Sequence, residues 1–292
     1  MSKMPDYLGR YRVAKFIRAG NSTQIWEAIK EDGSGRCVLK ILNRQLWGNR
    51  EEIGFLRHEY EVAAKLNHPN IIRVYEFNTD GKISYLALET FTDQNVKQVF
   101  RDRGHVALLP QFQRIVEQAA SALEHLHQKG WVHCDVKPDN FLLNAAGELK
   151  LIDFSIAQKM SKGIGALFRK RGPVQGTRSY MAPEQIRNES LDARADVYSL
   201  GCVLYELLAG KQPYSGDSPN DLLNKHLKAP IPSVLVSNDN VTAEFADCIR
   251  LMMSKDRARR PASMTEVLKQ VRTVRIFRVA PQAEGASPKA GG

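Results

Sequence analysis

The spacing of apolar residues changes once along the chain, and this change limits the fold more than any other sequence feature. The first third contains short runs rich in β-branched and aromatic residues, separated by turn residues such as Asp32-Gly33 and Asp80-Gly81. These runs cover residues 11–17, 25–29, 37–41, 71–77 and 83–91, and a helical stretch over 51–66 interrupts them. The pattern predicts a small antiparallel sheet with one prominent helix.

From about residue 111 the apolar period becomes that of an α-helix. The predicted helix ends near Lys129-Gly130, and its apolar face consists of Ile115, Val116, Ala119, Leu123 and Leu126. Residues 197–208 are apolar almost all round, which predicts a helix buried in a larger, mainly helical domain. The chain of 292 residues is therefore expected to form an α+β protein of about two folded units.

Cysteine usage and hydropathy indicate the compartment. Four cysteines are scattered without a CxxC pair or a metal-ligand spacing, as is usual in a reducing compartment: Cys37, Cys134, Cys202 and Cys248. The N-terminus has no signal-peptide pattern, and the apolar run 200–209 is too short to span a membrane. We expect a cytoplasmic, free-standing protein without a membrane span.

The charge of the chain is strongly positive but unevenly placed. The sequence has 42 Lys and Arg against 32 Asp and Glu, a net +10, and two segments hold the surplus: residues 153–184 carry +4 and residues 254–292 carry +6. In the second segment, Arg272, Arg275 and Arg278 are expected on one face of the last helix. No nucleic-acid-binding motif and no interleaving of basic and aromatic residues accompany these charges, so we expect no nucleic-acid partner.

Residues 133–140, His-Cys-Asp-Val-Lys-Pro-Asp-Asn, form the most informative string of the sequence. A loop constrained by proline can turn the carboxylate of Asp135, the cation of Lys137 and the carboxamide of Asn140 toward one point. After a predicted turn and strand comes Asp153, well placed to hold a divalent cation. Each residue alone could be a cap, a turn residue or a solvated charge, and only their joint spacing argues for chemistry.

That joint spacing resembles the protein-kinase family nearly from end to end. Asp135, Lys137 and Asn140 match the HRDxKxxN catalytic loop, and Asp153 matches the aspartate of DFG. Five further matches follow the family's order: Lys40 (VAIK lysine), Glu59 (helix C glutamate), residues 181–184 (Met-Ala-Pro-Glu, APE motif), residues 196–201 (Asp-Val-Tyr-Ser-Leu-Gly, DVWSLG) and Arg260, which is expected to pair with Glu184. Lys137 and the string Gly-Thr-Arg-Ser-Tyr over 176–180 resemble serine/threonine kinases. Tyr198 and the string Tyr-Met-Ala-Pro-Glu-Gln over 180–185 resemble the bacterial members of that group.

The resemblance implies a bilobal α+β fold. Residues 1–10 would be an N-terminal extension, and residues 11–90 an N-lobe with a small antiparallel sheet and helix C. Residues 91–279 would form a larger, mainly helical C-lobe, followed by a disordered tail over 280–292.

The resemblance also implies a nucleotide and a metal. Lys40 would hold the α- and β-phosphates of ATP with Glu59 orienting it, and Asn140 and Asp153 would bind Mg²⁺, with Mn²⁺ as the alternative. Asp135 would accept or orient the proton of the substrate hydroxyl, and Lys137 would face the γ-phosphate. The residues expected around the adenine and the phosphates are Ile17, Gly20, Ile25, Val38, Leu88 as gatekeeper, Glu89 to Phe91 as hinge, and Leu142.

Three departures from the family pattern limit the resemblance. Arg18, Gly20 and Thr23 stand where the family has three glycines, Ser155 replaces the DFG glycine, and Cys134 replaces the arginine that in many kinases captures an activation-loop phosphate. Since residues 157–175 contain one hydroxyl side chain, Ser161, we expect a serine/threonine kinase that needs no activation-loop phosphorylation.

Two alternatives stay open. A pseudokinase, or a weak nucleotide-binding scaffold acting through protein partners, fits the altered glycine loop and Ser155. Small-molecule kinases share the Asp, Asn and second Asp, but they usually lack the APE and DVWSLG elements. In the leading interpretation the basic block 153–184 is the activation segment, whose cations either favour an acidic surface on the protein substrate or order the segment without a phosphate.

Overall fold

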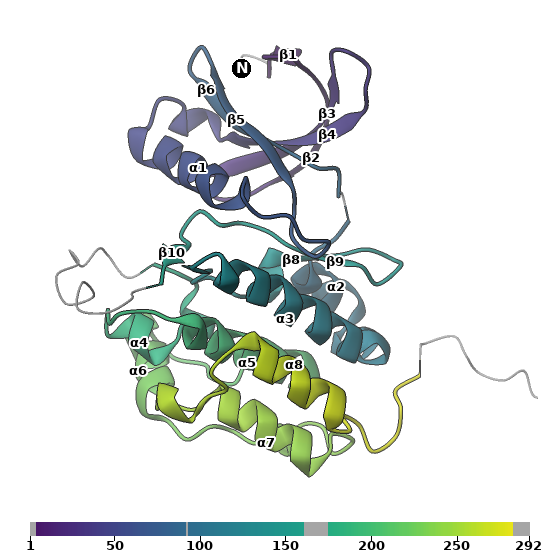
Figure 1. Ribbon diagram of the computed structural model, residues 1–292, viewed down its shortest axis with the longest axis vertical. Helices are drawn as coiled ribbons and strands as arrows, with labels where there is room; N and C mark the ends of the chain where they lie inside the picture. Colours follow the sequence, from purple (N-terminus) through teal and green to yellow (C-terminus); the bar gives the residue numbers. More distant parts are fainter. Residues whose placement is uncertain (1–3, 92, 161–174, 283–292) are drawn as a thin grey trace, which may run out of the picture. The chain divides into compact units, whose positions relative to one another are not determined.

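The computed structural model describes residues 4–91, 93–160 and 175–282 (Figure 1). These residues belong to two compact units: Met1–Asp93 with Ile152–Ile156, and Gln94–Leu151 with Ala157–Gly292. The segment that carries Asp153 therefore packs with the first unit although it lies far along the sequence. Residues 161–174, which include Ser161 and four of the six cations of the basic block, and residues 283–292 of the expected tail lie outside the described residues.

The first unit is built on an antiparallel sheet with the strand order β1-β2-β3-β4-β6-β5. Its strands are β1 (Tyr7–Leu8), β2 (Tyr11–Ala19), β3 (Thr23–Lys30), β4 (Arg36–Leu42), β5 (Val74–Asp80) and β6 (Ile83–Leu88). Each of the five predicted runs overlaps a strand, as its β-branched and aromatic residues predict. β5 begins three residues later than predicted, and β6 ends three residues earlier.

Alternation along β4 separates a core face from a second face. Cys37, Leu39 and Ile41 are fully buried and join a core that Tyr11 and Tyr85 complete from neighbouring strands. Because successive side chains of a strand point to opposite faces, Val38 and Lys40 lie on the other face.

One α-helix, α1 (Arg50–Ala63), lies beside this sheet (Figure 1). Asn49 caps it by accepting hydrogen bonds from the backbone N–H groups of Glu51 and Glu52. The helix buries Leu56, Glu59, Val62 and Ala63, which recur at helical spacing on one face. A charged residue thus stands in the middle of an apolar stripe, at the position expected for the helix C glutamate.

The second unit is mainly helical. Its α-helices are α2 (Val96–Arg103), α3 (Phe112–Gln128), α4 (Pro183–Ile186), α5 (Ala193–Ala209), α6 (Pro219–Lys228), α7 (Ala243–Met252) and α8 (Met264–Thr273). Two short antiparallel strand pairs accompany them: β7 (Trp131–Val132) with β10 (Gln158–Lys159), and β8 (Phe141–Leu143) with β9 (Leu149–Leu151). These elements confirm the α+β class predicted from the sequence.

The two helices predicted from periodicity are confirmed. α3 buries the five predicted apolar residues, and it ends one residue before Lys129. In α5 every residue from Ala195 to Leu208 is buried, and Gly210 closes the helix in the left-handed conformation at φ 73°. Within the described part of the chain, no helix combines the length and the apolar character needed to cross a bilayer.

The expectation that Arg272, Arg275 and Arg278 share one face of the last helix is wrong. α8 ends at Thr273, and the chain then runs extended beside residues 240–242. The backbone N–H of Thr242 donates to the Ile276 carbonyl, and that of Arg278 donates to the Asn240 carbonyl at 2.7 Å. These hydrogen bonds between distant segments end the helix before the last two arginines.

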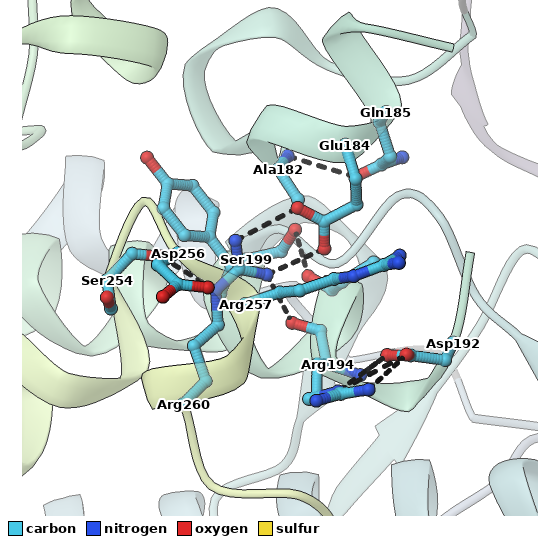
Figure 2. A network of polar contacts seen from close by, with 12 residues as sticks. Ala182, Glu184, Gln185, Asp192, Arg194, Ser199, Ser254, Asp256, Arg257 and Arg260 are labelled. Atoms are coloured by element: carbon cyan, nitrogen blue, oxygen red, sulfur yellow. Dashed lines mark hydrogen bonds and ion pairs between the residues drawn. The ribbon is translucent and has the colours of Figure 1, made fainter. Parts of the chain in front are cut away.

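The predicted pair of Glu184 and Arg260 is confirmed. The two side chains form a bidentate ion pair with N–O distances of 2.6 and 2.9 Å, and both are almost fully buried. Arg260 also donates to the carbonyls of Ser254 and Arg194, so its guanidinium joins three segments of the second unit (Figure 2).

Replacing Arg260 with Ala should lower the free energy of unfolding by about 3–5 kcal/mol, because it leaves the Glu184 carboxylate buried without a partner. Urea unfolding monitored by circular dichroism measures the change. The matched control is Arg250→Ala, which breaks an exposed ion pair with Asp247 at 3.0 Å and should cost less than about 1 kcal/mol. Equal losses for the two variants would contradict the prediction.

Candidate active site

In the first unit, Lys40, Glu59 and Asp153 come together from three elements. The Lys40 ammonium on β4 lies 2.7 Å from Glu59 Oε2 on α1 and 3.2 Å from Asp153 Oδ1. Glu59 also accepts a hydrogen bond from the backbone N–H of Phe154, which ties the segment 152–156 to α1. The sequence predicted all three residues, and the structure places them in one charge cluster.

The charge on Lys40 is fixed by its neighbours. Burial alone lowers the pKa of Lys40, but the carboxylates of Asp153 and Glu59 outweigh it and hold that pKa above its usual value. A buried ammonium that stays charged can neutralise further negative charge, such as that of a phosphate. The Asp153 side chain is one-third exposed, so it retains access to an additional ligand.

Three of the residues expected around the adenine, Ile25, Val38 and Leu88, share the face of the sheet that carries Lys40. Ile25 stands opposite Lys40 on the neighbouring strand, Val38 lies two residues before it, and Leu88 stands opposite Val38. Opposite residues of antiparallel strands lie on the same face, so these side chains surround one apolar area.

The remaining predicted contacts lie at the edges of that face or elsewhere. Ile17 lies at a β-bulge between Phe16 and Arg18, and Glu89 and Phe91 follow the end of β6. The Glu89 N–H donates to the Arg73 carbonyl at 2.9 Å, so it is already engaged within the unit. Leu142 lies on β8 in the second unit, where it is buried.

The loop that carries Gly20 is a tight turn, and a side chain that the sequence analysis missed holds it. Gly20 N–H donates to the Thr23 carbonyl at 2.7 Å, which closes the turn between β2 and β3. The Asn43 side chain donates to the carbonyls of Gly20 and Asn21 at 3.1 and 2.8 Å, and its backbone N–H donates to Ser22. Asn43 is 7% exposed, so its amide is a buried clamp on the loop.

In the second unit, Asp135 lies at the centre of a compact hydrogen-bonded cluster. Lys137 Nζ lies 2.6 Å from Asp135 Oδ2 and donates to Thr177 Oγ1 at 2.8 Å. The backbone N–H of Thr177 donates to Asp135 Oδ1 at 2.8 Å. The sequence analysis placed Thr177 in a family motif but gave it no contact, and the structure shows that it binds both charged residues.

Asn140 completes this cluster and is oriented by it. Its Nδ2 donates to the Asp135 carbonyl at 2.8 Å and to Asp135 Oδ2 at 3.2 Å. Because the amide nitrogen is engaged, Oδ1 is the atom that Asn140 could offer to a metal. A carboxamide oxygen and the Asp153 carboxylate are both ligands that Mg²⁺ accepts, so the chemistry of these donors fits the expected metal. Asn140 belongs to the second unit and Asp153 to the first.

Asp196, in the first turn of α5, holds the start of the loop that carries Asp135. This fully buried carboxylate accepts hydrogen bonds from the backbone N–H groups of His133 and Cys134 at 2.7 and 3.0 Å, and it contacts His127 Nε2 at 2.7 Å. Cys134 adopts a left-handed conformation at φ 68°. A non-glycine residue in this region is uncommon and persists where the surroundings impose it.

Segments of the second unit also line a groove of about 790 Å³. One side is formed by residues 176–181, which include Thr177 and the exposed Arg178, and the other by the stretch from Gly216 to Leu223 at the start of α6. The lining of the groove therefore includes Thr177, which binds Asp135.

Comparison with known proteins assigns the family. A family model described as protein kinase domain matches residues 11–271. Among similar proteins are the serine/threonine-protein kinase PknA of Mycobacterium tuberculosis, 32% identical over 285 residues, and PrkC of Bacillus subtilis, 32% identical over 249 residues. The alignments cover 96% and 85% of this chain but 64% and 38% of those proteins. The chain thus spans less than two thirds of the length of these relatives.

Replacing Asn43 with Ala should loosen the loop at Gly20, because the carbonyls of Gly20 and Asn21 lose the side-chain donor that holds them. Backbone amide exchange of Gly20 and Asn43 should accelerate by about tenfold, the effect of one or two net hydrogen bonds. Hydrogen–deuterium exchange resolved by NMR measures it, with Asn78→Ala on β5 as the control within the same unit. Unchanged exchange at Gly20 would show that the clamp contributes nothing.

Proposed function

The chain belongs to the protein kinase domain family, and we propose that it acts as a serine/threonine kinase that transfers the γ-phosphate of ATP to protein hydroxyl groups. The observation that carries the proposal is the double contact of Thr177 with Asp135 and Lys137. It joins a carboxylate, a cation and a segment of the groove into one arrangement suited to holding a substrate hydroxyl beside a base. The bacterial relatives, which are named serine/threonine-protein kinases, support the same substrate class.

The proposed roles follow from the charge that phosphoryl transfer must manage. Lys40, kept charged by Glu59 and Asp153, neutralises the α- and β-phosphates, and Lys137 faces the γ-phosphate. Asp135 accepts or orients the proton of the attacking hydroxyl. Ile25, Val38 and Leu88 provide an apolar surface for the adenine.

We propose that Asn140 and Asp153 hold Mg²⁺, with Mn²⁺ as the alternative. When bound, such a cation neutralises phosphate charge and aligns the phosphate chain. Within the chain itself, Asn140 remains oriented by Asp135, and Asp153 by Lys40. The protein thus presents both donors already turned by hydrogen bonds of its own.

The substrate is proposed to be a protein whose acceptor segment enters the groove lined by residues 176–181. Arg178 is exposed there and would favour an acidic neighbour of the acceptor. Four other cations of the basic block, Lys162, Arg169, Lys170 and Arg171, lie outside the described residues, so the preference for an acidic partner surface stays a prediction.

The alternative of a pseudokinase is favoured by the clamped loop at Gly20. Backbone N–H groups of a glycine-rich loop approach phosphates closely, and here Arg18 and Thr23 carry side chains at two of those positions. The choice between the two functions depends on whether Asp135 supports turnover.

Replacing Asp135 with Asn should lower phosphate transfer by at least about 100-fold, because the carboxamide cannot accept the hydroxyl proton. Nucleotide binding should persist, since Lys40 and its partners lie in the other unit. Labelled-phosphate incorporation measures the first and calorimetry the second. EDTA should abolish transfer by the unmodified protein. Equal background incorporation by the two proteins would instead support the pseudokinase.

Ser161→Ala should keep the turnover of the unmodified protein, and phosphatase treatment should leave it unchanged, because Cys134 offers no cation to an activation-loop phosphate. Thr177→Val serves as a matched control in the same segment: it removes the hydroxyl that binds Lys137 and should lower turnover by about tenfold. A large loss of turnover in Ser161→Ala, or after phosphatase, would refute independence from activation-loop phosphorylation.

A further inference from the structure

The backbone immediately before Asp135 is held by the side chain of Gln185. Gln185 lies in α4 and is 6% exposed. Its Nε2 donates to the Cys134 carbonyl at 2.9 Å, and its Oε1 accepts from the backbone N–H of Ala182 at 3.0 Å (Figure 2 shows the second contact). One buried amide therefore connects the loop of Asp135 with the segment that leads into α4.

The peptide unit held by Gln185 is the one that joins Cys134 to Asp135. Its carbonyl accepts from Gln185, and its N–H, which belongs to Asp135, donates to His133 Nδ1 at 3.3 Å. A peptide unit is planar, so hydrogen bonds at both edges fix its rotation. That rotation sets the position of the Asp135 Cα, which is part of the same plane and is the point from which the Asp135 side chain extends.

The packing around the Cys134 carbonyl accommodates the Gln185 side chain but leaves no room for a side chain at position 176. Gly176 lies against the same carbonyl: a Cβ there would stand 2.9 Å from Cys134 O and 3.7 Å from Gln185 Nε2. Gly176 also adopts φ 119°, which side chains rarely allow. The next residue, Thr177, is the one that binds Asp135 and Lys137. The segment 176–185 is thus attached to the loop of Asp135 at both of its ends.

We infer that Gln185 is a positioning residue for Asp135, and that its amide gives this protein a permanent link between the catalytic loop and the substrate-side segment. Many kinases make a comparable link reversibly, when a phosphate on the activation segment pairs with an arginine of the catalytic loop. Here the position of that arginine is Cys134, whose backbone carbonyl is held instead by an uncharged side chain. The inference rests on the proposed kinase function and explains how the segment is ordered without a phosphate.

The test compares Gln185→Met, which keeps the length of the side chain but removes both hydrogen bonds, with Gln185→Glu. Gln185→Met should lower kcat by about tenfold with little change in the KM for ATP, because one buried hydrogen bond near the reacting groups is lost. The amide of Thr177 should exchange faster, since its acceptor Asp135 is no longer fixed. Gln113→Met, on the exposed face of α3, is the control.

Gln185→Glu tests the positioning role through the pH dependence of kcat, which a merely structural role of Gln185 would leave unchanged. A protonated carboxyl can donate to Cys134 and accept from Ala182 as the amide does, whereas a carboxylate facing the carbonyl is repelled. Burial raises the pKa of such a carboxyl. The kcat of this variant, divided by that of the unmodified protein, should therefore rise as the pH falls from about 8 to about 6. The ratio removes the pH effects that the two proteins share, and Gln113→Glu should show no such trend.

The inference is overturned if Gln185→Met keeps full kcat and the slow exchange of Thr177. It is also overturned if the loss of kcat follows a matching loss of thermal stability and the Gln185→Glu ratio does not vary with pH. If the unmodified protein transfers no phosphate in an Asp135-dependent way, the proposed function fails by itself. The exchange of Thr177 then still decides whether Gln185 holds the loop.

Discussion

The buried carboxylate of Asp196 is the interaction on which the second unit depends. A fully buried charge is costly unless hydrogen bonds replace its hydration, and here two backbone N–H groups and His127 do so. Its place in the first turn of α5 adds the favourable field of the helix N-terminus. Since His133 and Cys134 are the residues just before Asp135, satisfying this charge also fixes the start of the loop. The requirement that stabilises the core therefore also places the proposed base.

The backbone conformations near the site follow from such requirements. Among the described residues, the non-glycine residues with positive φ are Cys134, Asp153 and Asn188. Two of them belong to the proposed site, one in each unit. Cys134 is held by Asp196 and Gln185, and Asp153 by Lys40. Cys134 and Asp153 are thus fixed by charged or amide groups, and their backbone conformation helps to orient the side chains of Asp135 and of Asp153 itself.

The sequence could predict those parts of the fold and of the site whose residues recur at a regular spacing or match the spacing of a family motif. The strand runs, the buried helix α5, the cluster of Lys40 with Glu59, and the pair of Glu184 with Arg260 all follow from periodic or family-wide patterns. The contacts of Asn43 and Gln185 could not be found in this way, because each acts through hydrogen bonds of one side chain to backbone groups that leave no sequence pattern. The end of α8 was missed for a related reason: hydrogen bonds with Asn240 and Thr242, 33 or more residues away in the chain, overrode the local helical pattern.

Asn43 and Gln185 play parallel parts in the two units. Each is a buried amide that holds backbone carbonyls of a loop, the first at Gly20 and Asn21 and the second at Cys134. In both places the family usually has an adjustable element, a glycine-rich loop or a phosphate-dependent contact. A loop that is ordered by folding loses its conformational entropy then, and it loses little more when a ligand binds. On the proposed function, this chain has exchanged adjustable loops for fixed ones, so its activity would depend on the stability of the fold and not on a modification of the activation segment.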